Sequence, residues 1–265
     1  MKRNRREFLK LAGVTAASAS VMSVTSGLIT AEASGAGVAK PTTILKKNKK
    51  ALTAKRWGMV IDTRKLETES DIEHIVSACH KIHNVPKMEN KNHEIKWVWE
   101  DEFKHVFAEQ EHELVNERLR HLPFLVLCNH CKNPSCVKAC PTNATFQTKE
   151  GLVMMDFHRC IGCRFCMAAC PYGSRSFNFQ DPRPFIKETN KEFPTRMKGV
   201  VEKCNFCAER LAVGKQPACV EASKGAIIFG DLDDPQSEIR EVLNTNYTIR
   251  RKPALGTGPS IYYIV

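Results

Sequence analysis

The sequence predicts an α+β protein built around repeated cysteine motifs. Eleven of the twelve cysteines fall into three dense groups, and short apolar segments of strand length lie beside each group. The first two groups are near-copies of each other, so an internal repeat underlies the fold. The groups are Cys128-x2-Cys131-x4-Cys136-x3-Cys140, Cys160-x2-Cys163-x2-Cys166-x3-Cys170 and Cys204-x2-Cys207-x11-Cys219.

The second group has the spacing C-x2-C-x2-C-x3-C-P, which is that of bacterial ferredoxins. Three cysteines on one tight loop can bind three corners of a single [4Fe–4S] cube, and Gly162 allows the loop to turn. The fourth cysteine, before a proline, points away toward a neighbouring cube. The first group has two extra residues in its loop, including Pro134, and we interpret it as the same kind of site.

Three other uses of cysteine are weaker explanations. Zinc sites also use paired C-x2-C motifs, and exported proteins often contain disulfides. Buried free thiols are common as well. None of these requires two near-copies of one tetrad, each followed by proline.

The N-terminal 33 residues predict a twin-arginine export signal. The motif Asn4-Arg5-Arg6-Glu7-Phe8-Leu9-Lys10 precedes a weakly apolar stretch at 11–30 and an Ala31-Glu32-Ala33 cleavage site. An ordinary secretory signal or an uncleaved anchor are alternatives, but the stretch is poor in Leu, Ile and Phe. Because this route exports folded proteins, it suits clusters inserted in the cytoplasm. We expect a periplasmic location, on the outer face of the cytoplasmic membrane.

The basic composition does not indicate nucleic-acid binding. The chain carries a net charge of +11, of which the predicted signal contributes +3. Three oxidised clusters of about −2 each would offset most of the remainder. The block at 46–50 is expected to belong to a flexible lead-in, residues 34–54.

The remaining elements follow in chain order. We expect strands at 57–62, 95–99, 122–127, 151–156 and 226–229, and a helical stretch over 103–119. Residues 174–199 are a connection. The Pro- and Gly-containing segment 231–265 is expected to wrap the outside or a partner.

The motif order resembles that of four-cluster ferredoxin subunits, which partner membrane quinone-reactive proteins and molybdopterin oxidoreductases. This resemblance implies a double ferredoxin-type fold with two pseudo-symmetric 2[4Fe–4S] modules and insertions. One module is 124–199 with its connection; the other combines 55–123 with 200–230. Residues 231–265 are then a C-terminal extension.

Two departures from that family imply that one cluster site is lost. The last cysteine of its fourth motif is replaced here by Ser223, and its first motif retains only Cys79. The other three positions of the first motif are Glu69, Ile72 and Ile75. The crossing rule of the family implies three complete sets: Cys128, Cys131, Cys136 with Cys170; Cys160, Cys163, Cys166 with Cys140; and Cys204, Cys207, Cys219 with Cys79. Alternatively, Cys79 is an ordinary buried thiol.

The strings at 57–62, 78–86 and 230–232 are similar to the DsrO family, the exported iron–sulfur subunits of the Dsr transmembrane complex. This implies two partners, a multihaem cytochrome c and an integral membrane quinone-interacting subunit. Three [4Fe–4S] clusters would relay electrons between them in dissimilatory sulfur metabolism, without a catalytic residue or a small-molecule substrate. The alternatives are the iron–sulfur subunit of an exported hydrogenase, nitrite reductase or molybdopterin oxidoreductase, and a zinc-stabilised scaffold.

Four histidines lie near the cysteines. His80 and His83 could cap a haem partner or shuttle protons, but we expect them to hydrogen-bond locally. His130 and His158 flank ligands and are candidates for tuning cluster potentials.

Overall fold

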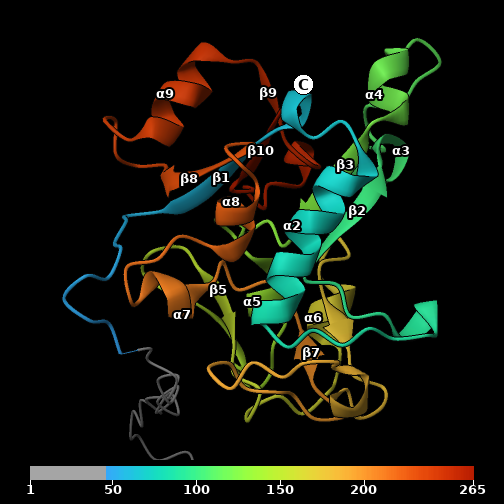
Figure 1. Ribbon diagram of the computed structural model, residues 1–265, viewed down its shortest axis with the longest axis vertical. Coiled ribbons are helices and arrows are strands. Elements are labelled where there is room, and N and C mark those ends of the chain that lie inside the picture. Colours follow the sequence, from blue (N-terminus) through green and yellow to red (C-terminus); the bar gives the residue numbers. More distant parts are fainter. Residues whose placement is uncertain (1–45) are drawn as a thin grey trace, which may run out of the picture. The chain divides into compact units, whose positions relative to one another are not determined.

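The structure, a computed structural model, describes residues 46–265 (Figure 1). The predicted export signal and residues 34–45 of the lead-in lie outside this range. The described part of the lead-in is not free: the backbone N–H groups of Asn48 and Leu52 donate to the carbonyls of Ala212 and Leu211. No helix within 46–265 is long and apolar enough to span a bilayer.

A four-stranded sheet has the order β8-β1-β10-β9. β1 (Trp57–Asp62) is buried along its whole length, pairs antiparallel with β8 (Ile227–Asp231) and parallel with β10 (Ile261–Ile264). β9 (Thr248–Ile249) pairs antiparallel with β10. The strand predicted at 57–62 is confirmed, and the strand predicted at 226–229 is found one residue later and two residues longer.

The C-terminal segment was expected to wrap the outside or a partner, and the placement on the outside is wrong. It contributes α9 (Glu238–Thr245) and two strands, and buried Ile261 and Tyr263 lie in the main core. β10 occupies a central position between β1 and β9 because its four residues are largely apolar and pair with both neighbours. Its short length among Pro and Gly residues concealed it in the sequence.

Three two-stranded ladders hold the ends of the cysteine loops. β2 (Val98–Glu102) pairs with β3 (Pro123–Leu127), β4 (Thr145–Gln147) with β5 (Val153–Met155), and β6 (Ser176–Phe177) with β7 (Val201–Glu202). Cys128 directly follows β3, and Cys204 follows β7 by one residue. The strand expected at 95–99 begins three residues later, while those expected at 122–127 and 151–156 are confirmed with shorter bounds.

The helices are short apart from α2 (Glu69–Ile82) and α9. The others are α3 (Phe103–Val106), α4 (Glu117–His121), α5 (Ser135–Lys138), α6 (Phe165–Ala168), α7 (Ala208–Leu211) and α8 (Ala218–Ala222). Short 3-10 turns cover Thr63–Lys65, Lys91–His93, Arg183–Phe185 and Pro253–Leu255. The continuous helical stretch expected over 103–119 is therefore wrong, because it divides into α3 and α4.

α2 was not predicted, although its N-terminus carries a capping box formed by Thr68 and Asp71. Only Ile72, Ile75 and Cys79 on its core face are buried. This narrow stripe lies against α8 and β2. Two of the three residues expected to replace cluster ligands, Ile72 and Ile75, therefore lie on the packing face of the helix.

A buried ion pair attaches the 190s connection to the core. Arg196 Nη2 lies 2.6 Å from Glu202 Oε2, and both side chains are almost fully buried. Glu202 also accepts hydrogen bonds from Trp97 Nε1 and Asn178 Nδ2. Arg196 donates to the carbonyls of His83 and Asn84, just beyond α2. The pair thus links β7 to the end of α2.

We predict that Glu202→Gln lowers the free energy of unfolding by about 3–5 kcal/mol, because it leaves the Arg196 guanidinium buried and uncompensated. Urea denaturation followed by circular dichroism measures the change. Glu188→Gln, which disrupts an exposed pair with Lys81, is the matched control and should change the free energy by less than about 1 kcal/mol. Equal effects of the two substitutions would contradict the prediction.

Candidate metal centres

The first cysteine group lines a hollow together with one cysteine of the second group. Cys128 enters from β3, Cys136 lies on α5, and Cys131 lies on the loop between them. Cys170, which follows α6, completes a set of four around a hollow of about 320 Å³ that is partly open to solvent. The structure thus brings together the four cysteines that the family resemblance assigned to one cluster.

The second group forms a matching arrangement. Cys160, Cys163 and Cys166 line a hollow of about 260 Å³, and Cys140 from the first group is the fourth cysteine in its lining. Cys166 lies on α6, and Cys140 follows α5. Among the twelve cysteines, all within the described residues, only Cys163 is exposed.

The third group gathers four buried cysteines from distant parts of the chain. Cys79 comes from α2, Cys204 follows β7, Cys207 precedes α7, and Cys219 lies on α8. Burial raises the pKa of the Cys79 thiol, and the nearby Cys204 and Cys219 raise it further. Cys79 therefore lies with the third group, as the resemblance implied.

All three loops share one backbone feature that the cysteine spacing only partly disclosed. The second residue after the first cysteine has a positive φ in each loop: 38° at His130, 70° at Gly162 and 55° at Phe206. Only Gly162 signals this conformation in the sequence, because histidine and phenylalanine adopt it rarely. At Gly162 an added Cβ would also lie only 2.5 Å from the carbonyl oxygen of Gly199.

Contacts between the loops place the three groups in a row. Burial is the main reason that the pKa of Cys204 is raised, and the charge of the nearby Cys128 in the first group raises this pKa further. The rings of His130 and Phe206, one from each of these loops, stack with centroids 3.7 Å apart. Burial also raises the pKa of Cys166, which feels the charges of Arg175, Cys140, Cys160 and Cys136. The first group therefore lies between the third and the second.

Two buried cations test whether these thiols fit an anionic cluster. Arg175 lines the first hollow; its Nη1 donates to Thr145 Oγ1, while its Nη2 has no hydrogen-bond partner within 46–265. Lys203 is buried beside Cys204 and donates to two backbone carbonyls. Neither has a carboxylate partner among the described residues. Burying such charges alone is costly, so a cysteine-bound [4Fe–4S] cluster of negative charge fits this surrounding.

Backbone amides provide a second sign of fit. The N–H groups of Thr145, Phe206 and Ala218 point at the sulfur atoms of Cys140, Cys204 and Cys207, at 3.4–3.5 Å. Such hydrogen bonds stabilise thiolate ligands and tune cluster potentials. When bound, the clusters would supply one-electron redox chemistry; the chain supplies ligands, positive charge and amide donors.

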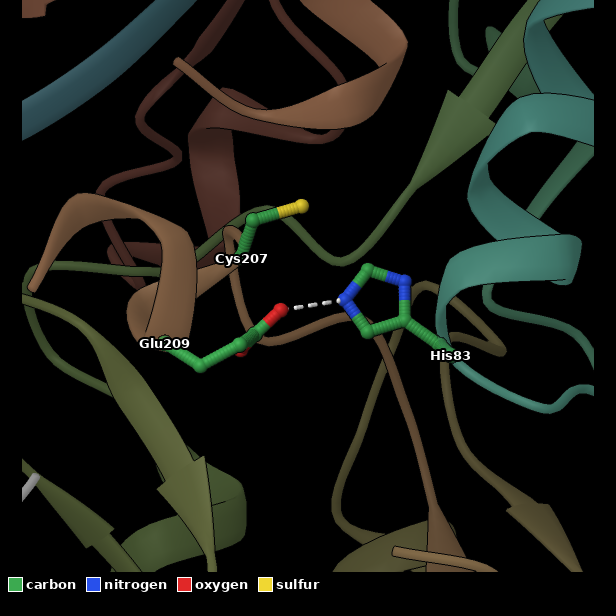
Figure 2. Close-up of side chains that lie close together, drawn as sticks. All are labelled: His83, Cys207 and Glu209. Carbon is green, nitrogen blue, oxygen red and sulfur yellow. Dashed lines mark hydrogen bonds and ion pairs between the residues drawn. The ribbon is translucent and has the colours of Figure 1, made fainter. Parts of the chain in front are cut away.

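His83 and Glu209 form an ion pair beside the third group, and Glu209 was not predicted (Figure 2). His83 Nε2 lies 2.8 Å from Glu209 Oε1, and His83 Nδ1 lies 3.0 Å from the carbonyl oxygen of Cys79. The His83 ring stacks on Trp97 and meets the edge of Phe193. Ligand atoms of His83, Cys207 and Glu209 all lie within 4.8 Å of one another, so they could also hold a single metal ion.

The four histidines have distinct surroundings. His80 Nε2 lies 3.0 Å from the carbonyl oxygen of Val98, so the expectation that His80 and His83 bond locally is confirmed. His130 is buried, and its Nδ1 accepts from the N–H of Val153. His158 is exposed, and its backbone N–H donates to Asp156.

Two of the four positions at which the family resemblance would place a further cluster are filled by buried apolar side chains. Ile72 and Ile75 are buried in the main core, whereas Glu69 is exposed at the start of α2. Ser223 ends α8; its Oγ donates to the carbonyl of Val220 and accepts from the N–H of Ile227. α2 packs on α8, and Ile72 and Ile75 lie on the buried face of α2.

Comparison with known proteins agrees with this arrangement. Residues 120–183, which contain the first two groups, match the 4Fe-4S dicluster domain. The chain is 38% identical to the Hdr-like menaquinol oxidoreductase iron–sulfur subunit 1 of Archaeoglobus fulgidus, over 98% of this chain and 97% of that protein. It is 35% identical to the menaquinone reductase iron–sulfur cluster-binding subunit of Nitratidesulfovibrio vulgaris, over 79% and 88%. Identity to the arsenate respiratory reductase iron–sulfur subunit of a Shewanella species is also 35%, over 79% and 96%.

The environment of His80 generates a pH prediction. Burial lowers the pKa of His80 to about 4, against about 6.5 in an unfolded chain. Since the unfolded state binds the proton more readily, the stability from neutral His80 is present above pH 6.5 and declines as pH falls toward 4. We predict that, between pH 7 and pH 5, the metal-loaded wild type loses up to about 2 kcal/mol more than His80→Gln.

Urea denaturation of both proteins at the two pH values measures this difference. The same substitution at exposed His121 is the control and should follow the wild type. Parallel pH dependence of the wild type and His80→Gln would show that protonation of His80 does not limit stability.

Proposed function

The chain belongs to the family of 4Fe-4S dicluster iron–sulfur subunits of respiratory redox complexes, and we propose that it relays electrons through three [4Fe–4S] clusters. It is an electron-transfer subunit and not the catalytic component of such a complex. The observation that supports the proposal most strongly is the pair of hollows, each lined by three cysteines of one motif and one of the other.

We propose a quinone-reactive membrane protein as one partner. Two relatives aligned over most of the chain are named as subunits of a menaquinol oxidoreductase and a menaquinone reductase. The similarity of 57–62 and 78–86 to DsrO supports a multihaem cytochrome c as the other partner, in sulfur metabolism. Electrons would pass between the two along the row of cysteine groups.

A molybdopterin reductase is the second candidate partner. The relative from Shewanella, an arsenate respiratory reductase subunit, aligns with 79% of this chain and supports it. Purification of the native complex from membranes, followed by mass spectrometry and haem staining, distinguishes the two. A multihaem cytochrome with a membrane quinone subunit favours the first proposal, and a large molybdenum subunit favours the second.

We also propose that the protein acts on the periplasmic side, exported by the twin-arginine route. The motif at 4–10 and the Ala31-Glu32-Ala33 site support this proposal. Export of folded protein is compatible with the buried cysteines of the third group, which need metal in place as the core packs.

The number of clusters yields a prediction for Cys79. The mature wild type should contain about twelve irons and twelve sulfides, and Cys79→Ala should lose about four irons or show a three-iron signal in electron paramagnetic resonance. The reason is that only the third cluster loses a ligand. Ser77→Ala, an exposed change on the same helix, should keep all the iron.

Ser223→Cys tests whether one added cysteine is enough to create a fourth cluster. It should not raise the iron content, because Glu69, Ile72 and Ile75 provide no thiolates. Full iron in Cys79→Ala would show instead that Cys79 is an ordinary buried thiol, and iron near sixteen in the wild type would refute the three-cluster proposal.

The crossed ligand sets predict non-additive losses. Cys140→Ala should damage the cluster of Cys163 and remove about four irons. Adding Cys163→Ala to this variant should remove little further iron, because both cysteines belong to the same cluster. Adding Cys128→Ala to Cys140→Ala should instead bring the total loss to about eight irons, because two clusters are then affected. Iron and sulfide analysis of the three variants decides the assignment. If the Cys140→Ala, Cys163→Ala variant lost more iron than the Cys140→Ala, Cys128→Ala variant, Cys140 would belong to the cluster of its own motif.

A further inference from the structure

The loop that carries Cys163 exposes apolar side chains around a cluster ligand. Ile161 and Phe165, on either side of this exposed cysteine, are 67% and 59% exposed. An isolated exposed apolar residue is ordinary, but a contiguous group commonly marks an interaction site. What matters is therefore whether other exposed apolar residues adjoin the loop.

Two contacts extend the apolar surface beyond the loop. Gly162 lies directly against Gly199, so the loop runs beside the segment that contains half-exposed Met197. The Arg164 guanidinium lies over the rings of Phe177 and Phe179, 5.4 and 5.8 Å from their centroids. We define the Cys163 face by seven residues that are all exposed: Ile161, Cys163, Arg164, Phe165, Phe179, Met197 and Lys198.

The Cys163 face is cationic. Arg164 and the adjacent Lys198 are exposed, and neither forms an ion pair among the described residues. Six carboxylates line a groove elsewhere, at the start of α2 and along β2: Glu67, Glu69, Glu100, Asp101, Glu102 and Glu111. In Figure 1 the N-terminal end of α2 lies toward the top of the view, whereas α6 and β7 lie in the lower half. The positive charges of the Cys163 face and the carboxylates of the acidic groove therefore lie in different regions of the molecule.

We propose that the Cys163 face is the docking surface for an electron-transfer protein whose own redox centre lies behind an apolar patch rimmed by carboxylates. The proposal rests on the proposed function. The second cysteine group ends the row and includes the one exposed cysteine, so it is the group nearest to an external acceptor. Apolar side chains would exclude water at the contact, while Arg164 and Lys198 would attract the carboxylate rim.

The electron step requires only the two redox centres. When bound and reduced, the cluster held by Cys160, Cys163, Cys166 and Cys140 would supply one electron to the docked acceptor, and no bond would form or break. Complexes of this kind are small and transient, and their association rates fall as salt screens the charges. Rate and salt dependence are therefore suitable measures of docking.

The test is stopped-flow oxidation of dithionite-reduced holoprotein, after removal of excess dithionite, by two protein acceptors. Plastocyanin with an acidic surface is the complementary probe, and basic mitochondrial cytochrome c is the contrasting one. At low salt, Arg164→Glu and Lys198→Glu should each slow oxidation by plastocyanin about tenfold and leave the reaction with cytochrome c equal or faster. Phe165→Ser should also slow oxidation by plastocyanin. High salt should reduce the differences in rate between the wild type and the charge variants.

Arg118→Glu is the control, because Arg118 is exposed on α4 near the acidic groove; it should match the wild type with plastocyanin. Iron content of every variant is measured first. If clusters are present and both acceptors are reduced at rates independent of Arg164, Lys198 and Phe165, the docking proposal is overturned while the proposed function stands. A protein without reducible clusters would overturn both.

Discussion

The fold depends on negative charge at the cysteine groups. Arg175 and Lys203 are buried beside thiols without carboxylate partners among the described residues, and no neutral core would hold them at acceptable free energy. The surrounding elements cannot provide the missing stability alone, since the ladders have two to five residues per strand and α5, α6 and α7 have four each. Metal ligation is thus the interaction that orders the loops, and the cations match its charge.

Cysteines that lie in the hollow of another motif tie separate loops of the chain together. Cys170 lies with the first group and Cys140 with the second, so neither loop can be ordered independently of the other. Cys79 brings α2 to the third group, where the His83–Glu209 pair joins the same two segments again. The His130–Phe206 stack then connects the first group with the third. The contacts that bring the cysteine groups close enough for electron transfer are therefore the same contacts that hold the loops together.

Sequence reasoning worked where the chemistry requires particular residues at fixed spacing. The cysteine motifs and β1 could be recognised, because fixed ligand spacing and a fully buried apolar run leave clear patterns, while the assignment of each cysteine to a cluster stays a prediction. α2 was missed because its apolar stripe contains only three buried positions, and α9 and β10 because they are short and lie among turn residues. The left-handed backbone at His130 and Phe206 and the role of Glu209 are set by tertiary contacts, which no local pattern encodes.

The packing of Ile72, Ile75 and Ser223 would make a fourth cluster site difficult to build at these positions. A single Ile→Cys change would remove buried apolar volume and add a thiol that no metal yet uses. Ser223→Cys would replace a hydroxyl that both donates to Val220 and accepts from Ile227 with a weaker hydrogen-bonding sulfur. Glu69, Ile72, Ile75 and Ser223 would all have to become cysteine before a cube could form, and the changes at the three buried positions would each weaken the core. The packing of α2 on α8 would therefore oppose the stepwise construction of a fourth site at these positions.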